Sequence, residues 1–221
     1  MFDTKSNLVT FADYLRWLGD IPADRVRTHP EPGTATVDDW QRLVDQGGNC
    51  ELAEGILVDR PMGARESLIA TILSAVLRRA SRDGRDGFLL GEQGFIRLAD
   101  RTVRAPDVAF YRWDDLPEGG LAVNRVPRIA PMIAIEILSR GNTAAEMDLK
   151  RREYFAAGTT LVWIIDPARR TAAIYTSPDD VQMLRDNDTL TAPQILPLLR
   201  LPLAELFDEA DGKRRSSAES R

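Results

Sequence analysis

The sequence predicts a mixed α/β domain, a central mixed β-sheet flanked by helices, with an N-terminal extension. Apolar residues recur at helical spacing from Glu66 to about residue 83. Residues 133–138 and 160–166 are short runs rich in isoleucine, valine and leucine, which is typical of buried strands. Residues 143–157, between those two runs, have a helical pattern, so this part of the chain is a strand–helix–strand unit.

The first part of the chain is expected to be mainly helical. Residues 8–19 place apolar side chains at helical spacing, and Pro22 follows the end of that helix. A second short helix is predicted at residues 37–45, with Thr36 as its N-cap. Residues 50–59 then indicate a strand or a hairpin around a glycine.

Strands dominate the rest of the chain. Residues 88–98 and 103–111 are predicted to be two strands joined by a polar turn. Shorter strands are expected near the C-terminus, at residues 172–176, 181–185 and 189–194. The predicted organisation is an N-terminal helical extension at 1–35, a folded domain at 36–208 and a disordered basic tail at 209–221.

The composition is that of a globular protein. The chain has 221 residues, of which 43% are hydrophobic, enough for a core. The first residues contain no uninterrupted apolar segment after a basic start, and no run reaches the ~20 apolar residues needed to cross a bilayer. We therefore expect a soluble, cytoplasmic protein without membrane partners.

Cysteine and histidine are too rare for several kinds of catalysis. A single cysteine, Cys50, excludes an internal disulfide and a multi-cysteine metal site. A single histidine, His29, excludes sites built on several imidazoles, and its Pro/Gly-rich surroundings favour a surface position. Any chemistry is expected to depend on carboxylates and amines.

The charge neither requires nor forbids a nucleic-acid substrate. A formal net charge of −5 counts against non-specific coating of nucleic acid. Arginines concentrate between residues 78 and 104, which allows either a basic strip or a charge-mixed surface.

Glu136 is the most unusual residue, because it lies in the middle of the apolar run at 133–138. Carboxylates are almost never fully buried unless they are paired or bound to a metal. Glu136 therefore requires a partner, and a functional role is favoured.

Two charged residues on neighbouring elements are candidate partners. Asp107 follows Pro106, and by itself it is typical of an acid at a strand end. Lys150 lies on the helix that follows the Glu136 strand, at the edge of an apolar stripe. Arg151 falls near the centre of that stripe, and snorkelling explains either residue, so the orientation of Lys150 stays open.

Together the three residues indicate a metal-dependent phosphodiesterase. Carboxylates from adjacent strands, here Asp107 and Glu136, can hold Mg²⁺ while it keeps several waters. The backbone carbonyl of Ile137 is a further candidate ligand, and Mn²⁺ is an alternative metal. Lys150 would orient the attacking water and favour its deprotonated form.

The order of motifs is similar to that of the Uma-two family of putative restriction endonucleases, in the PD-(D/E)XK nuclease superfamily. The similarity covers roughly residues 36–208. Its motifs are Glu51-Leu52-Ala53-Glu54-Gly55, Pro106-Asp107-Val108, Ile135-Glu136-Ile137-Leu138-Ser139, Asp148-Leu149-Lys150 with Tyr154, Ala157-Gly158, Trp163, Asp166-Pro167, and the leucine-rich segment at 198–207.

The resemblance implies a restriction-endonuclease-like core and assigns roles to the residues. The usual Glu-x-Lys of the superfamily would place its lysine at Leu138, so the lysine has migrated to Lys150, while Asp107 and Glu136 bind the metal. A further acid would be Glu51 or Glu66. The position after Glu66, where many relatives have histidine, is Ser67. Glu66 is also explained as a helix N-terminal carboxylate favoured by the dipole.

The sequence thus predicts a Mg²⁺-dependent DNA endonuclease whose partners are DNA and a divalent metal, with a homodimer as the common arrangement of nuclease folds. A catalytically inactive nuclease-fold protein that binds DNA is the alternative. In a third interpretation, the N-terminal extension forms an oligomer interface and the acids merely pair with arginines.

Overall fold

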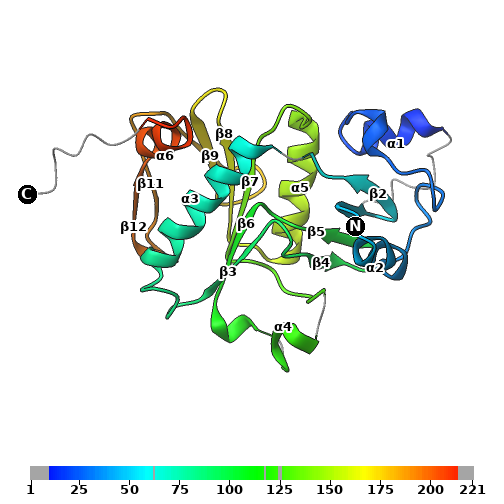
Figure 1. Ribbon diagram of the computed structural model, residues 1–221, viewed down its shortest axis with the longest axis horizontal. Coiled ribbons are helices and arrows are strands. Elements are labelled where there is room, and N and C mark those ends of the chain that lie inside the picture. Colours follow the sequence, from blue (N-terminus) through cyan, green and yellow to red (C-terminus); the bar gives the residue numbers. More distant parts are fainter. Residues whose placement is uncertain (1–9, 62, 117, 124–125, 214–221) are drawn as a thin grey trace, which may run out of the picture.

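A mixed sheet forms the centre of the molecule in the computed structural model, which describes residues 10–61, 63–116, 118–123 and 126–213 (Figure 1). Strands β7 and β8 are parallel and the other neighbours are antiparallel, which confirms the predicted mixed sheet. From edge to edge the strands are β10 (Val181–Leu184), β9 (Thr171–Tyr175), β8 (Leu161–Asp166), β7 (Ile133–Ile137), β6 (Val108–Tyr111) and β3 (Phe88–Gly91).

Helices cover both faces of this sheet. Helix α3 (Ala64–Ala80) packs on one face beside α6 (Leu203–Ala210) and the hairpin of β11 (Thr189–Ala192) and β12 (Leu196–Pro202). Helix α5 (Ala144–Ala157) lies on the opposite face (Figure 1). Side chains alternate between the two faces of a strand, so each strand of the sheet contributes to both cores.

A second sheet lies beside the first and orders its strands β2-β1-β5-β4. Helix α2 (Val37–Asp45) packs against it, with Trp40 donating a hydrogen bond from Nε1 to the carbonyl of Cys50 at 2.8 Å. The strands are β1 (Cys50–Ala53), β2 (Ile56–Asp59), β4 (Ile96–Ala99) and β5 (Thr102–Arg104).

The prediction of two long strands at 88–98 and 103–111 was wrong. Each run is divided between the two sheets: β3 and β6 pair in the large sheet, while β4 and β5 form a hairpin in the small one. Gly91 and Gly94 bound the first break, and Pro106, which has no N–H to donate, lies in the second. The second break carries the chain from one sheet to the other immediately before Asp107.

The predicted helices are confirmed within small shifts of their ends. Helix α1 is Phe11–Trp17, because Thr10 is its N-cap, and Thr36 caps α2 in the same way. Residues 8 and 9 of the first predicted helix lie outside the described residues. The predicted basic tail lies mostly outside them too, although α6 reaches Ala210 and Lys213 pairs with Asp208 at 2.8 Å. Short helical turns are η2 (Ala23–Arg25), η3 (Trp113–Asp115) and α4 (Gly120–Val123).

Three of the arginines of residues 78–104 are paired with acids or buried. Arg82 pairs with Asp86, and Arg97 lies 3.5 Å from Asp100. Arg104 is buried. Among the described residues, no helix combines the length and the apolar character needed to cross a membrane.

Candidate active site

Glu136 points to the helix α5 side of the sheet. Its neighbours Ile135 and Ile137 pack on the opposite side, in the core with α3, whereas Ala134 packs against Tyr154 of α5. The two-residue period of the strand therefore places the Glu136 carboxylate against α5. It is 5% exposed.

Asp107 lies next to Glu136 because of the strand register. Strands β6 and β7 are antiparallel, with Val108 opposite Ile135. Continuing this register by one residue sets Asp107 opposite Glu136, and residues opposite each other share a face. The Ile137 N–H donates a hydrogen bond to Asp107 Oδ2 at 2.7 Å, which fixes the carboxylate at the end of β7.

Lys150 faces the sheet, which settles the orientation that the sequence left open. Its Nζ lies 3.3 Å from Glu136 Oε2, and the residue is 5% exposed. Tyr154, one turn further along α5, donates from its hydroxyl to Glu136 Oε1 at 2.6 Å. The i, i+4 spacing puts both groups on one face of the helix. Arg151 lies instead over the ring of Tyr175, 4.3 Å from its centroid.

Glu51 lies deeper than the other acids and is surrounded by cations. Strands β1 and β5 pair with Leu52 opposite Val103, so Glu51 and Arg104 are cross-strand neighbours. Arg104 donates to Glu51 Oε2 at 2.9 Å, Lys150 Nζ lies 3.2 Å away and the Ala105 N–H donates to Oε1 at 3.1 Å. Glu51 is 1% exposed. Glu51 is thus a shared ion-pair partner of Lys150 and Arg104.

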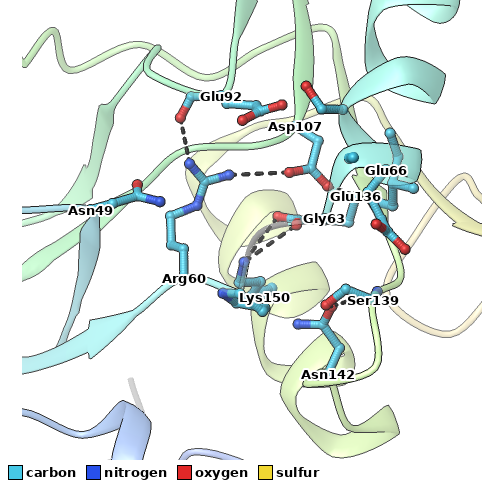
Figure 2. A pocket seen from close by; sticks show the side chains of 14 residues that line it. Asn49, Arg60, Gly63, Glu66, Glu92, Asp107, Glu136, Ser139, Asn142 and Lys150 are labelled. Carbon is cyan, nitrogen blue, oxygen red and sulfur yellow. Dashed lines mark hydrogen bonds and ion pairs between the residues drawn. The ribbon is translucent and has the colours of Figure 1, made fainter.

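Arg60 belongs to the site although the sequence analysis did not single it out. It follows strand β2, and its Nη2 donates to Asp107 Oδ1 at 3.1 Å. Its Nε lies 3.9 Å from Glu51 Oε1, and its Nη1 donates to the carbonyl of Glu92. Figure 2 shows the guanidinium between Glu92 and Asp107. The signal in the sequence was its position: Arg60 comes just after the apolar run of β2 and directly before Pro61.

Asp107, Glu136, Lys150 and Arg60 line a pocket of about 400 Å³ where the two sheets meet α5 (Figure 2). Glu51 is not among the lining residues. Asn49 is, and its Oδ1 accepts no hydrogen bond within the described part of the chain. The lining residues are Asn49, Arg60, Pro61, Gly63, Ala64, Glu66, Ser67, Glu92, Asp107, Glu136, Ile137, Ser139, Asn142 and Lys150.

The other candidate acid, Glu66, lies on the pocket wall in the first turn of α3. Its carboxylate lies close to Gly63, the N-cap residue of that helix. The position is therefore compatible with both earlier interpretations, a site acid and a carboxylate at a helix N-terminus. Ser67 is exposed and lines the same wall.

The rim of the pocket beyond β7 is held by an ion pair from the N-terminal segment. Arg25 donates to both carboxylate oxygens of Glu146, at 3.0 and 2.7 Å, and to the carbonyl of Gly141 at 2.8 Å. Asn142 donates to Glu146 at 3.0 Å and accepts from Ser139. The segment before residue 36 thus supports the loop that carries Ser139 and Asn142.

Burial and the neighbouring charges shift the pKa values of the site residues. Burial raises the pKa of Glu136 to about 7; Lys150 opposes this shift, while Asp107 and Glu51 add to it. Burial raises the pKa of Asp107 despite the nearby Arg60. Burial alone would lower the pKa of Lys150, but Glu136 and Glu51 raise it. Lys150 is therefore an ammonium at neutral pH.

Glu51 titrates in the opposite direction from Glu136. Burial would raise the pKa of Glu51, but Lys150, Arg104 and Arg60 lower it to about 2. One buried carboxylate is thus ionised at neutral pH, while the pKa of its neighbour lies near neutrality, a contrast found at functional sites.

The chain matches the family described as "Putative restriction endonuclease" (Uma2) over residues 36–204, and it belongs to that family. A search of curated proteins found no match. A solved structure with the same fold is described as a putative nuclease belonging to DUF820 from Anabaena variabilis, with 22% sequence identity and a TM-score of 0.70. The alignment covers 79% of this chain and 98% of the other.

Proposed function

We propose that this protein is a Mg²⁺-dependent DNA endonuclease, with Mn²⁺ as an alternative metal. The observation that carries the proposal is that Asp107, Glu136 and Lys150, which come from two strands and a helix, meet in one pocket. DNA as substrate rests on membership of a family described as restriction endonucleases.

The donor set is compatible with Mg²⁺. Over the residues that the structure describes, no group of three or more acidic, histidine or cysteine side chains is placed to hold a metal by itself. Mg²⁺ usually takes one or two carboxylates and keeps several waters. Asp107 raises the pKa of Glu136, and Glu51 raises the pKa of both, so a cation between Asp107 and Glu136 would relieve this repulsion. The Ile137 carbonyl is the proposed third ligand.

The other residues around the proposed metal would then have these roles. Lys150, held as an ammonium by Glu136 and Glu51, stabilises negative charge that develops on the phosphate and holds the attacking water. Tyr154 orients the Glu136 carboxylate through its hydrogen bond. A bound Mg²⁺ would supply charge neutralisation and a more acidic water.

The test is cleavage of single-stranded, duplex and branched DNA by purified protein with Mg²⁺ or Mn²⁺. We expect cutting that EDTA abolishes and that Glu136→Ala and Lys150→Ala each reduce at least ~100-fold, the usual effect of losing a charge-stabilising group. Arg152→Ala is the control, because Arg152 is an exposed cation on the same helix that pairs with Asp148 and Asp179. Failure to cut any of these substrates with either metal would contradict the proposal.

A non-catalytic DNA-binding protein on the same fold is the second candidate. The pairing of Arg60 with Asp107 favours it, because an internal cation already balances a proposed metal ligand. Calorimetry separates the two: metal binding that Asp107→Ala abolishes supports a nuclease, and absence of binding supports the alternative. The proposed homodimer is tested by light scattering on the same samples.

A further inference from the structure

Arg60 faces the side of Asp107 that the proposed metal would use. One oxygen of Asp107, Oδ2, accepts the Ile137 N–H, so the other, Oδ1, is the one left for a cation. Arg60 Nη2 lies 3.1 Å from Oδ1. In the metal-free protein the guanidinium therefore balances the charge of this carboxylate.

The position of Arg60 is fixed from several sides. Its side chain is 8% exposed, and Glu51, Asp107 and the Glu92 carbonyl all lie around the guanidinium. A buried cation held by several acceptors stays near the site when one acceptor changes partner. Arg60 thus remains on the pocket wall when Asp107 binds something else.

A guanidinium in this place also suits a phosphate. Arginine presents a planar fork of donors that matches two phosphate oxygens. Once Asp107 has a metal, the Nη2 donor that it released is available on the same wall as Lys150. The metal would then bind Asp107, and the DNA phosphate would bind Arg60, so the two ligands together replace the Arg60–Asp107 pair.

We infer that Arg60 couples metal binding to DNA binding: it weakens metal binding to the empty site and contacts the phosphate of the cleaved DNA when the metal is present. This inference rests on the proposed function, because it requires a metal at Asp107. It adds a substrate-binding residue and a reason for metal and DNA to bind together. Coupling of this kind is reciprocal, so each partner raises the affinity for the other.

The test is Arg60→Gln, with Mg²⁺ and Mn²⁺ titrated calorimetrically into DNA-free protein at pH 8, a pH at which Glu136 is largely ionised. Removing a cation beside a carboxylate changes the affinity for another cation by about tenfold or more. We expect Arg60→Gln to bind metal about tenfold more tightly than the wild type, while its KM for DNA cleavage rises about tenfold. A purely structural role would weaken both.

Two further variants complete the experiment. Arg27→Gln removes the same charge from a surface pair with Asp59, the residue before Arg60. It should leave the metal affinity and the KM for DNA cleavage unchanged. Arg60→Lys keeps the charge without the fork, so it should bind metal as weakly as the wild type and still show a raised KM. Circular dichroism confirms that each variant is folded before titration.

The outcomes distinguish this inference from the proposed function. A wild type that binds metal and cuts DNA, with no gain in metal affinity in Arg60→Gln or an equal gain in Arg27→Gln, overturns the role of Arg60 alone. A wild type that binds no metal with or without DNA overturns the proposed function and this inference together.

Discussion

Lys150 and Glu136 face each other between helix α5 and strand β7, with Nζ of the lysine 3.3 Å from Oε2 of the glutamate. Both residues are 5% exposed. Buried ion pairs add little net stability, because the desolvation of both charges offsets their attraction. The pair is therefore better explained by the chemistry of the pocket than by the needs of the fold.

Glu51 is expected to be essential for the stability of the site. Glu51→Gln keeps the shape of the side chain but leaves Arg104 and Lys150 without their shared anion. Removing one partner of a buried charge pair costs about 3–5 kcal/mol. The free energy of unfolding from urea titration measures this loss.

The matched control for Glu51 is Asp59→Asn. Asp59 lies on the neighbouring strand and pairs with Arg27, and both side chains are more than a third exposed. Such surface pairs contribute about 0–1 kcal/mol. Equal losses in the two variants would mean that Glu51 is not the centre of the charge network.

Stability should depend on pH through Glu136. The pKa of this carboxyl is about 7 in the folded protein, against its ordinary value of 4.5 in the unfolded chain. Between those pH values the folded state keeps a proton that the unfolded state has released. The free energy of unfolding of metal-free protein should thus fall, relative to Glu136→Gln, as pH rises from 4.5 to 7, by up to about 1.4 kcal/mol per pH unit, and then level off.

Tyr154→Phe provides a second measurement of the same carboxyl. The Tyr154 hydroxyl lowers the pKa of Glu136 by donating a hydrogen bond to it. Without that bond the pH window of the stability loss should extend upward. Paired urea titrations at several pH values show this, and an unchanged window in Tyr154→Phe would contradict the assigned hydrogen bond.

The segment before residue 36 is expected to stabilise the pocket, although the family match begins after it. Arg25→Gln removes a buried bidentate pair with Glu146, whose side chains are 11% and 6% exposed, and should cost about 3–5 kcal/mol. Arg27→Gln, on the same segment, should cost about 1 kcal/mol or less. Equal effects in urea titrations would show that the Arg25 contact does not brace the pocket rim.

Local patterns in the sequence were sufficient for most helices and for the strands around Glu136. The apolar run at β7, the capping threonines and the helical spacing of α3 act within a few residues of each other. The division of 88–98 and 103–111 between two sheets was missed, because strand pairing depends on residues far apart in the sequence.

The sequence by itself determined that Glu136 needed a partner and that Asp107 and Lys150 were the candidates, because a charge within an apolar run is costly wherever the strand lies. Only the tertiary structure decided that Lys150 faces the sheet, that Glu51 lies beneath it and that Arg60 pairs with Asp107. Register and helix packing bring these groups together across separations of 14 to 99 residues, and no local pattern encodes such distances.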